Sequence, residues 1–219
     1  RPHGGKGSLA NAFDEVCKYY SAEGQAAPFE RQALIKLRHI AGDAALGKKV
    51  ETHRDSFVYS GAPWDLTVAL DLRRQQVKQL VEPGQINLKH SHGGIVTLEY
   101  AIQYLQVMHG HRHPSLRTPN TLRALAALID VGLIPRATGE NLRKSYLFIR
   151  MLIDGLRMVR GNTKDLVIPP PDSDEFIFLA RRVGYQTEDW QAGARHLQTD
   201  IEEHMKQNRQ FFEKMFGKV

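Results

Sequence analysis

The chain has 219 residues, of which 42% are hydrophobic and 25% charged, a composition typical of a globular protein with a buried core. It contains no apolar run of about 18 residues and no charged-then-apolar leader, so we expect neither a membrane span nor an export signal. Cys17 is the single cysteine, which excludes an internal disulfide and favours the cytoplasm. The chain begins at Arg1 rather than methionine, so we expect a piece of a longer protein.

The net charge of +6 at pH 7 would suit nucleic acid, nucleotide phosphates or an acidic protein partner. The basic residues are, however, scattered through amphipathic segments and form no long block. A solvated helical surface is therefore the favoured interpretation, and binding to nucleic acid is the less favoured one.

The first half of the chain shows apolar residues at helical spacing, which predicts four helices. The apolar face of the first predicted helix runs from Leu9 to Tyr20. The apolar face of the second lies within residues 29–40. Residues 46–57 suggest a third helix, and residues 64–81 form a fourth. Four of its apolar residues are spaced to face a core: Leu66, Leu70, Val77 and Leu80.

The second half begins with the breaker Pro83-Gly84, after which residues 86–89 could form a short strand before a turn at 90–94. A strong helical stripe covers residues 95–108. Asn120 is a good N-cap for the next helix, and Thr138 for the one after it.

The last part of the chain starts at the stiff segment Pro169-Pro170-Pro171. Asp172 and Glu175 have the spacing of a capping box. A final long helix runs from about Thr187. These patterns predict an all-α fold, a bundle of about eight helices with at most a short strand or loop remnant at the N-terminus.

The chain shows no self-sufficient catalytic or metal centre. Its histidines at 90 and 92 and at 109, 111 and 113 look like exposed loop residues rather than metal ligands, and Cys17 falls on an apolar stripe. The glycine-rich opening lacks the spacing of a P-loop. The acidic pairs Asp172/Asp174 and Glu202/Glu203 lie in the linker and on the solvent face of the last helix, so we expect no metal site and no catalytic residue.

A smaller set of polar residues stands in apolar or glycine-rich surroundings. Glu30, Lys36 and Arg38 crowd the second predicted helix, while Lys89 precedes and Glu99 follows a Gly-Gly pair. Gly93 and Gly94 at the start of a helix would leave free N–H groups pointing outward, a natural anion site, although a purely structural helix start is the favoured alternative.

Three stretches carry a family resemblance: residues 1–9 (Arg-Pro-His-Gly-Gly-Lys-Gly-Ser-Leu), 29–38 (Phe-Glu-Arg-Gln-Ala-Leu-Ile-Lys-Leu-Arg) and 93–100 (Gly-Gly-Ile-Val-Thr-Leu-Glu-Tyr). In order and spacing they resemble the glutamine synthetase adenylyltransferases, whose most recognisable motif is Gly-Gly-Ile-x-acid-Ile-Glu-Phe. The similarity covers nearly the whole chain. Thr97 stands where the family usually has a second acid, and Phe29 where tryptophan is common.

The resemblance implies a parent enzyme that attaches AMP from ATP to glutamine synthetase and removes it by phosphorolysis, with ATP and magnesium as cofactors. Each half of such an enzyme is a nucleotidyltransferase domain followed by a helical domain. On this interpretation residues 1–8 are a remnant of the nucleotidyltransferase domain, residues 9–168 are the main helical domain, and residues 169–219 are C-terminal helices packed on the same bundle. The implied partners are glutamine synthetase, the PII signalling protein and the missing nucleotidyltransferase domain.

The resemblance also implies assisting roles, because the catalytic carboxylates would lie upstream of this chain. Four basic residues would contact nucleotide phosphates: Arg1, Lys36, Arg38 and Lys89. Glu30 and Glu99 would orient them. The fragment alone is expected to be inactive and to bind no cofactor. The alternative is a non-enzymatic helical module for protein interaction.

Overall fold

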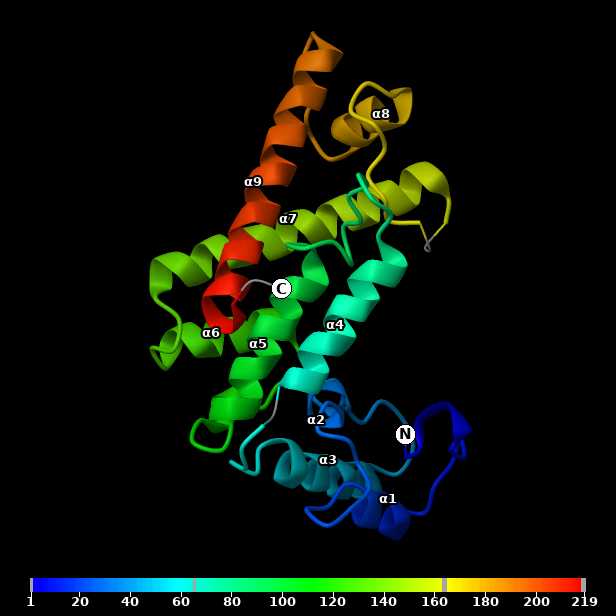
Figure 1. Cartoon of the computed structure of the whole chain (residues 1–219), viewed down its shortest axis with the longest axis vertical. Helices are drawn as coiled ribbons and strands as arrows, with labels where there is room; N and C mark the ends of the chain where they lie inside the picture. The colour runs from blue at the N-terminus through cyan, green and yellow to red at the C-terminus, as the bar shows by residue number, and fades with distance from the viewer. Residues whose placement is uncertain (1, 65, 163–164, 218–219) are drawn as a thin grey trace. The chain divides into compact units, whose positions relative to one another are not determined.

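The computed structural model describes residues 2–64, 66–162 and 165–217 (Figure 1). Within them the chain is all-α, which confirms the predicted fold class. The α-helices are α1 (Phe13–Tyr19), α2 (Glu30–Leu34), α3 (Ala44–Val58), α4 (Thr67–Leu80), α5 (Ile95–His109), α6 (Thr121–Asp130), α7 (Arg136–Arg160), α8 (Asp174–Arg182) and α9 (Trp190–Phe216), with short 3-10 helices at Gly4–Lys6 and Pro114–Leu116. None of the described helices combines the length and apolar character needed to cross a bilayer.

Two compact units make up the chain. Unit 1 comprises Arg1–Asp71 and Ile102–Ile134, and unit 2 comprises Leu72–Ala101 and Pro135–Val219, so that α4 and α5 contribute residues to both. These units describe packing within this chain. The boundaries predicted at residues 8 and 168 concern the domains of a longer protein and stay predictions.

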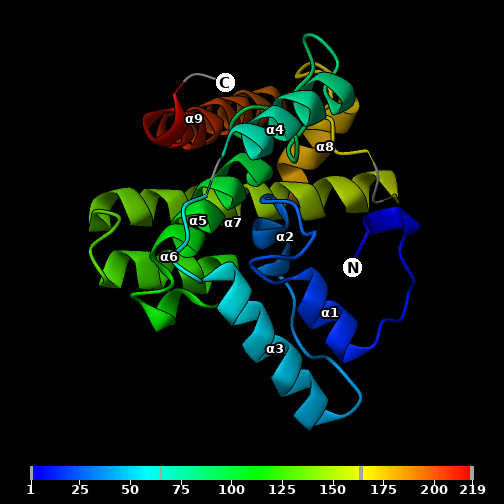
Figure 2. The same cartoon turned by 60° about the horizontal axis from the view of Figure 1, so that its bottom comes forward.

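Each unit has its own apolar core. In unit 1, α2 packs on α3 (Figure 2). The core residues there include Tyr20, Ile35, Val58, Trp64 and Val107. In unit 2, α7, α8 and α9 pack on one another (Figure 1). Their core includes Leu88, Leu152, Phe176, Leu197 and Ile201. Much of the predicted helical stripes thus meets in these two cores. Leu80, predicted to face a core from the fourth helix, is instead 49% exposed.

The predicted second helix is too long. Helix α2 ends at Leu34, after which the N–H groups of Ile35 and Leu37 bond three residues back, a tighter 3-10 pattern that leaves the α-helix. Arg54 on α3 donates to the carbonyl of Leu37, which fixes the chain in its reversal toward α3. Ile40 is consequently 82% exposed. Leu9, predicted to begin the apolar face of the first helix, precedes α1 and is 92% exposed.

Of the two helix caps predicted at Asn120 and Thr138, one is present in the structure. Asn120 is confirmed, since its Oδ1 accepts the N–H of Arg123 at 3.0 Å. The N-cap predicted at Thr138 is wrong, because α7 begins directly after Pro135 and Thr138 lies within the helix.

At α8 the cap is Ser173 rather than Asp172, and Glu175 forms an ion pair with Arg160 instead of closing a capping box. The last helix begins after the cap residue Asp189, not at Thr187. The strand predicted at residues 86–89 is reduced to one isolated bridge between Asn87 and Val167.

Candidate functional site: the turn before helix α5 and the pocket beside it

Asn87 and Ser91, both buried, hold the turn that leads into α5. Asn87 Oδ1 accepts the N–H groups of Lys89 and His90, each at 3.0 Å. Ser91 Oγ accepts the N–H of Asn87 at 2.8 Å, and the N–H of Ser91 donates to Asn87 O at 3.0 Å. Side chains of this type favour turns because they bond backbone groups a few residues away. The result is a closed, hydrogen-bonded turn.

The N–H groups at the start of α5 are used within the chain. Gly93 N donates to Thr97 Oγ1 at 3.1 Å, and Gly94 N donates to Ser91 O at 2.9 Å. The next two N–H groups donate to carbonyl oxygens of the preceding turn. The expectation of free, outward N–H groups at Gly93 and Gly94 is therefore wrong, because the turn folds back and satisfies them.

Gly93 also fixes how α9 packs on this turn. Its φ of +88° lies in the left-handed region, and a Cβ there would approach Met205 O to 2.1 Å. Asn208, fully buried on α9, donates from Nδ2 to Gly93 O at 3.0 Å. A glycine is thus required both by the backbone conformation and by the close approach of α9.

Arg73 on α4 lies buried beneath the turn, with 2% of its surface exposed. Its Nη2 donates to His90 O at 2.9 Å, to Ser91 O at 3.3 Å and to Thr97 Oγ1 at 3.0 Å. Its Nη1 donates to Gln76 Oε1 at 3.2 Å. No carboxylate in the described part of the chain forms an ion pair with this guanidinium. Burial lowers the pKa of Arg73 to about 10, so the group stays charged at neutral pH.

Thr97 explains the departure from the family motif noted above. The residue is 3% exposed, and its hydroxyl lies against the Arg73 guanidinium. A position where the resemblance expects an acid therefore faces a buried cation in this structure. Here a neutral hydroxyl replaces the expected carboxylate, which leaves the charge of Arg73 without an internal counter-charge.

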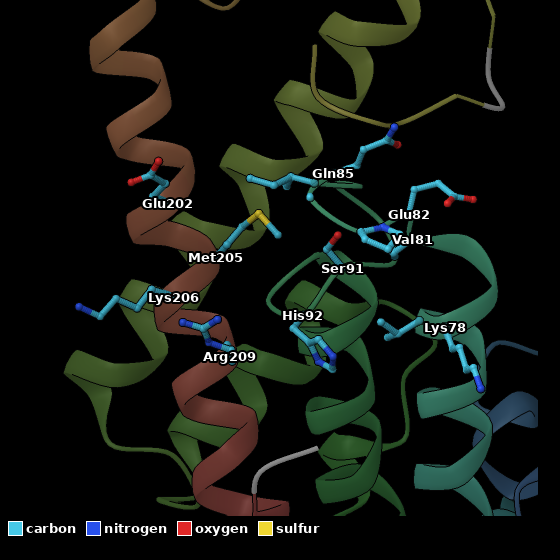
Figure 3. Close-up of a pocket in the computed structure, with 14 residues that line it drawn as sticks. Lys78, Val81, Glu82, Gln85, Ser91, His92, Glu202, Met205, Lys206 and Arg209 are labelled. Atoms are coloured by element: carbon cyan, nitrogen blue, oxygen red, sulfur yellow. The ribbon is translucent and has the colours of Figure 1, made fainter. Parts of the chain in front are cut away.

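A pocket of about 670 Å³ opens beside the turn (Figure 3). Its apolar lining comes from Val77, Val81, Ile86 and Met205, and its charged lining from Lys78, Glu82, Glu202, Lys206 and Arg209. Arg209 extends from α9 toward His92, while Lys206 extends away from the pocket centre. A hollow of about 10 Å³ shares His92 and Arg209 with this pocket. Its lining also includes Arg73, Thr97, Phe212 and Glu213.

The two histidines of the turn are neutral at pH 7. Burial, followed by the charges of Lys89 and Arg73, lowers the pKa of His90 to about 4. Burial also lowers the pKa of His92, helped by Arg73 and Arg209 and opposed by Glu213. The positive charge at this turn and its pocket therefore comes from lysines and arginines, and Glu82, Glu202 and Glu213 oppose it.

The site residues predicted in unit 1 lie in different surroundings. Glu30 accepts hydrogen bonds from the hydroxyls of Tyr19 and Tyr20 at 2.9 and 3.2 Å. Lys36 Nζ donates to Thr121 Oγ1 at 2.8 Å and also to a backbone carbonyl. Arg38 is exposed and lines a surface cavity of about 380 Å³.

In unit 2, Lys89 is exposed on the turn, and Glu99 accepts a hydrogen bond from the Tyr146 hydroxyl at 3.3 Å. Arg1 lies outside the described residues. The phosphate-assisting and orienting roles of these side chains stay predictions.

Arg73, Asn208 and Arg209 were missed by the sequence interpretation. Two of them carry a recognisable signal. Arg73 lies at a core position of the α4 stripe, between Leu70 and Val77, and Asn208 lies between the core residues Met205 and Phe212 of α9. A polar residue at a core position of an apolar stripe indicates a buried polar contact.

Two family models match this chain. The family model described as "GlnD PII-uridylyltransferase" matches residues 68–216, and the model "Glutamate-ammonia ligase adenylyltransferase" matches residues 1–53. A protein of Mycobacterium bovis with the name "Bifunctional glutamine synthetase adenylyltransferase/adenylyl-removing enzyme" is 35% identical over 83% of the chain. The chain belongs to the glutamine synthetase adenylyltransferase family.

Other members of this family with the same name are similarly related. The Corynebacterium glutamicum protein is 30% identical over 92% of the chain, and the Hahella chejuensis protein is 36% identical over 69%. The chain spans only 18%, 19% and 16% of the length of these three relatives, in the order named. It therefore corresponds to less than a fifth of each.

Proposed function

We propose that this chain is the helical, substrate- or regulator-binding part of a bifunctional enzyme that attaches AMP to glutamine synthetase and removes it. The observation that carries the proposal is the similarity to proteins named for both reactions, at 35% identity over 83% of the chain for the Mycobacterium bovis protein. The folded Gly93-Gly94 turn, at the place of the family motif, gives this similarity a structural counterpart.

We further propose that the catalytic carboxylates, and with them ATP and magnesium, bind in another part of the enzyme. Glu202 and Glu203 occupy exposed positions on α9. Their hydrogen bonds go to glutamines on the same helix. Side chains arranged in this way support a solvated surface rather than a converging metal site.

The proposed partners are glutamine synthetase, the PII signalling protein and a nucleotidyltransferase domain of the same enzyme, in the cytoplasm. Exposed Lys89 and Arg38 would assist nucleotide phosphates. Lys36 would do so only by leaving Thr121. Glu30 and Glu99 would orient the elements that carry these cations through their tyrosine contacts.

The test is an assay of the full-length protein that contains this chain, with labelled ATP and glutamine synthetase for AMP attachment and with phosphate for its removal. Both reactions are expected. Lys89→Gln is expected to slow at least one of them about tenfold or more through lost phosphate contacts, whereas the matched control Lys144→Gln, exposed on α7, should not. Absence of both reactions would overturn the proposal and favour a non-enzymatic interaction module. Equal rates for the two variants would remove Lys89 from the phosphate-assisting set.

A further inference from the structure

We propose that the pocket beside the α5 turn binds a small organic anion, whose charged group lies between Arg209 and His92 above the buried Arg73. The ligand class is a carboxylate or phosphate ester with a short apolar part. The inference does not depend on the proposed enzymatic function, because it stands on the charge and shape of this pocket alone.

The charge argument begins with Arg73. Its guanidinium is 2% exposed and donates to two carbonyls, a hydroxyl and an amide, so its full charge has no internal carboxylate partner among the described residues. The charge lies beside Thr97, in the first turn of α5, where the helix dipole is also positive. In a poorly solvated interior both effects attract an anion more strongly than they would in water.

The shape argument concerns two neighbouring spaces, which share His92 and Arg209 in their linings. The hollow beside Arg73 has about 10 Å³, close to the space that a single water or one anionic oxygen occupies. The larger pocket has about 670 Å³, in the range of small-molecule sites. Val81 and Met205 contribute apolar surface to it from opposite sides. This combination fits a molecule with a charged end and a short apolar body.

Glu213 is the natural competitor of such a ligand. It is half-buried on α9, lines the hollow together with Arg209, and its charge opposes the lowering of the His92 pKa. An external anion must therefore share the cations with this carboxylate. Removing its charge with Glu213→Gln is expected to tighten anion binding severalfold.

The experiment is a calorimetric titration of the 219-residue chain with hexanoate, hexyl phosphate and the neutral analogue hexanamide. At least one anion is expected to bind about tenfold more tightly than hexanamide, and the tighter of the two identifies the chemical source. Arg209→Gln should weaken anion binding about tenfold, whereas Lys214→Gln, an equal charge change at an exposed position of the same helix, should not. Equal binding of the anions and hexanamide, or binding by no probe, would overturn the proposal. So would full anion affinity in Arg209→Gln.

A second pair of variants tests the role of Arg73 without removing it. Thr97→Asp places a carboxylate beside the guanidinium and is expected to abolish anion binding, while the neutral, similarly shaped Thr97→Asn should retain it. Circular dichroism melting of both variants separates loss of binding from loss of folding. Unchanged affinity in a folded Thr97→Asp protein would contradict the role of Arg73.

Discussion

Two buried arginines, one in each unit, meet different electrostatic surroundings. Arg31 in unit 1 is 6% exposed and donates to Val58 O at 3.2 and 2.8 Å and to Ala62 O at 3.0 Å. Val58 is the last residue of α3, where the helix dipole is negative. Arg73 in unit 2 lies beside the first turn of α5, where the dipole is positive.

The difference shows that burial alone does not determine whether a buried arginine serves stability or ligand binding. The charge of Arg31 is offset by the end of a helix, which suits a structural contact that joins α2 to α3. The charge of Arg73 is offset by neutral dipoles only, although the turn satisfies its hydrogen bonds. A site with unbalanced charge beside a pocket is better suited to a ligand than to stability.

The largest expected effect comes from the turn that surrounds Arg73. Gly93→Ala should destabilise the chain by about 3 to 4 kcal/mol, because it combines a left-handed backbone with a clash against Met205 O. Urea unfolding followed by circular dichroism measures the change.

Gly84→Ala is the matched control for this variant. Gly84 has a similar φ of +79°, but its Cβ would meet nothing within 4 Å. It should cost only about 1 kcal/mol, the conformational part of the effect. Equal costs at the two positions would contradict the close packing of α9 on the turn.

A middle-sized effect is expected from pH. The pKa of His90 is lowered from 6.5 to about 4 in the folded chain, so the unfolded chain binds the proton first as pH falls. Stability is therefore full above pH 6.5 and falls between pH 6.5 and 4, by about 2 kcal/mol after allowance for the partial exposure of the ring.

Urea unfolding at several pH values measures this slope, with His90→Gln as the comparison. The variant should show a flatter profile in that window, since its amide does not titrate. An identical profile for the two proteins would mean that burial and the neighbouring charges do not lower the pKa of His90.

The smallest expected effect is a gain in stability at Arg73. Thr97→Asp should stabilise the chain by about 1 kcal/mol at neutral pH, because an ion pair with the buried guanidinium replaces a hydrogen bond to a neutral hydroxyl. Thr97→Asn should show no such gain. Thermal unfolding of the two variants measures the difference. An aspartate variant less stable than the parent chain would indicate that neutral dipoles already balance the charge of Arg73.

The helical fold could be predicted from the sequence because apolar stripes and caps are local signals. The stripe of α9 is buried from Leu197 to Phe212, although Trp190 at its start is 57% exposed, and the cap at Asn120 appears as expected. The second predicted helix failed because its end depends on Arg54, which reaches back from α3 to Leu37. Local spacing carries no information about such a contact.

The site was less predictable for the same reason. The Gly93-Gly94 pair could be recognised, but its N–H groups are satisfied by Thr97 and Ser91 in a fold that spacing does not specify. Asn208 contacts Gly93 across 115 residues of sequence. A polar residue within an apolar stripe predicts a buried hydrogen bond. The sequence does not show which residue is the partner.

The central claim, that this chain is a binding part of a glutamine synthetase-modifying enzyme, is tested most directly by calorimetry. The 219-residue chain would be titrated with glutamine synthetase and with PII, each with and without glutamine and ATP. The account predicts micromolar binding to at least one of them, changed by glutamine or ATP. Absence of binding to both proteins under every condition would contradict a substrate- or regulator-binding role.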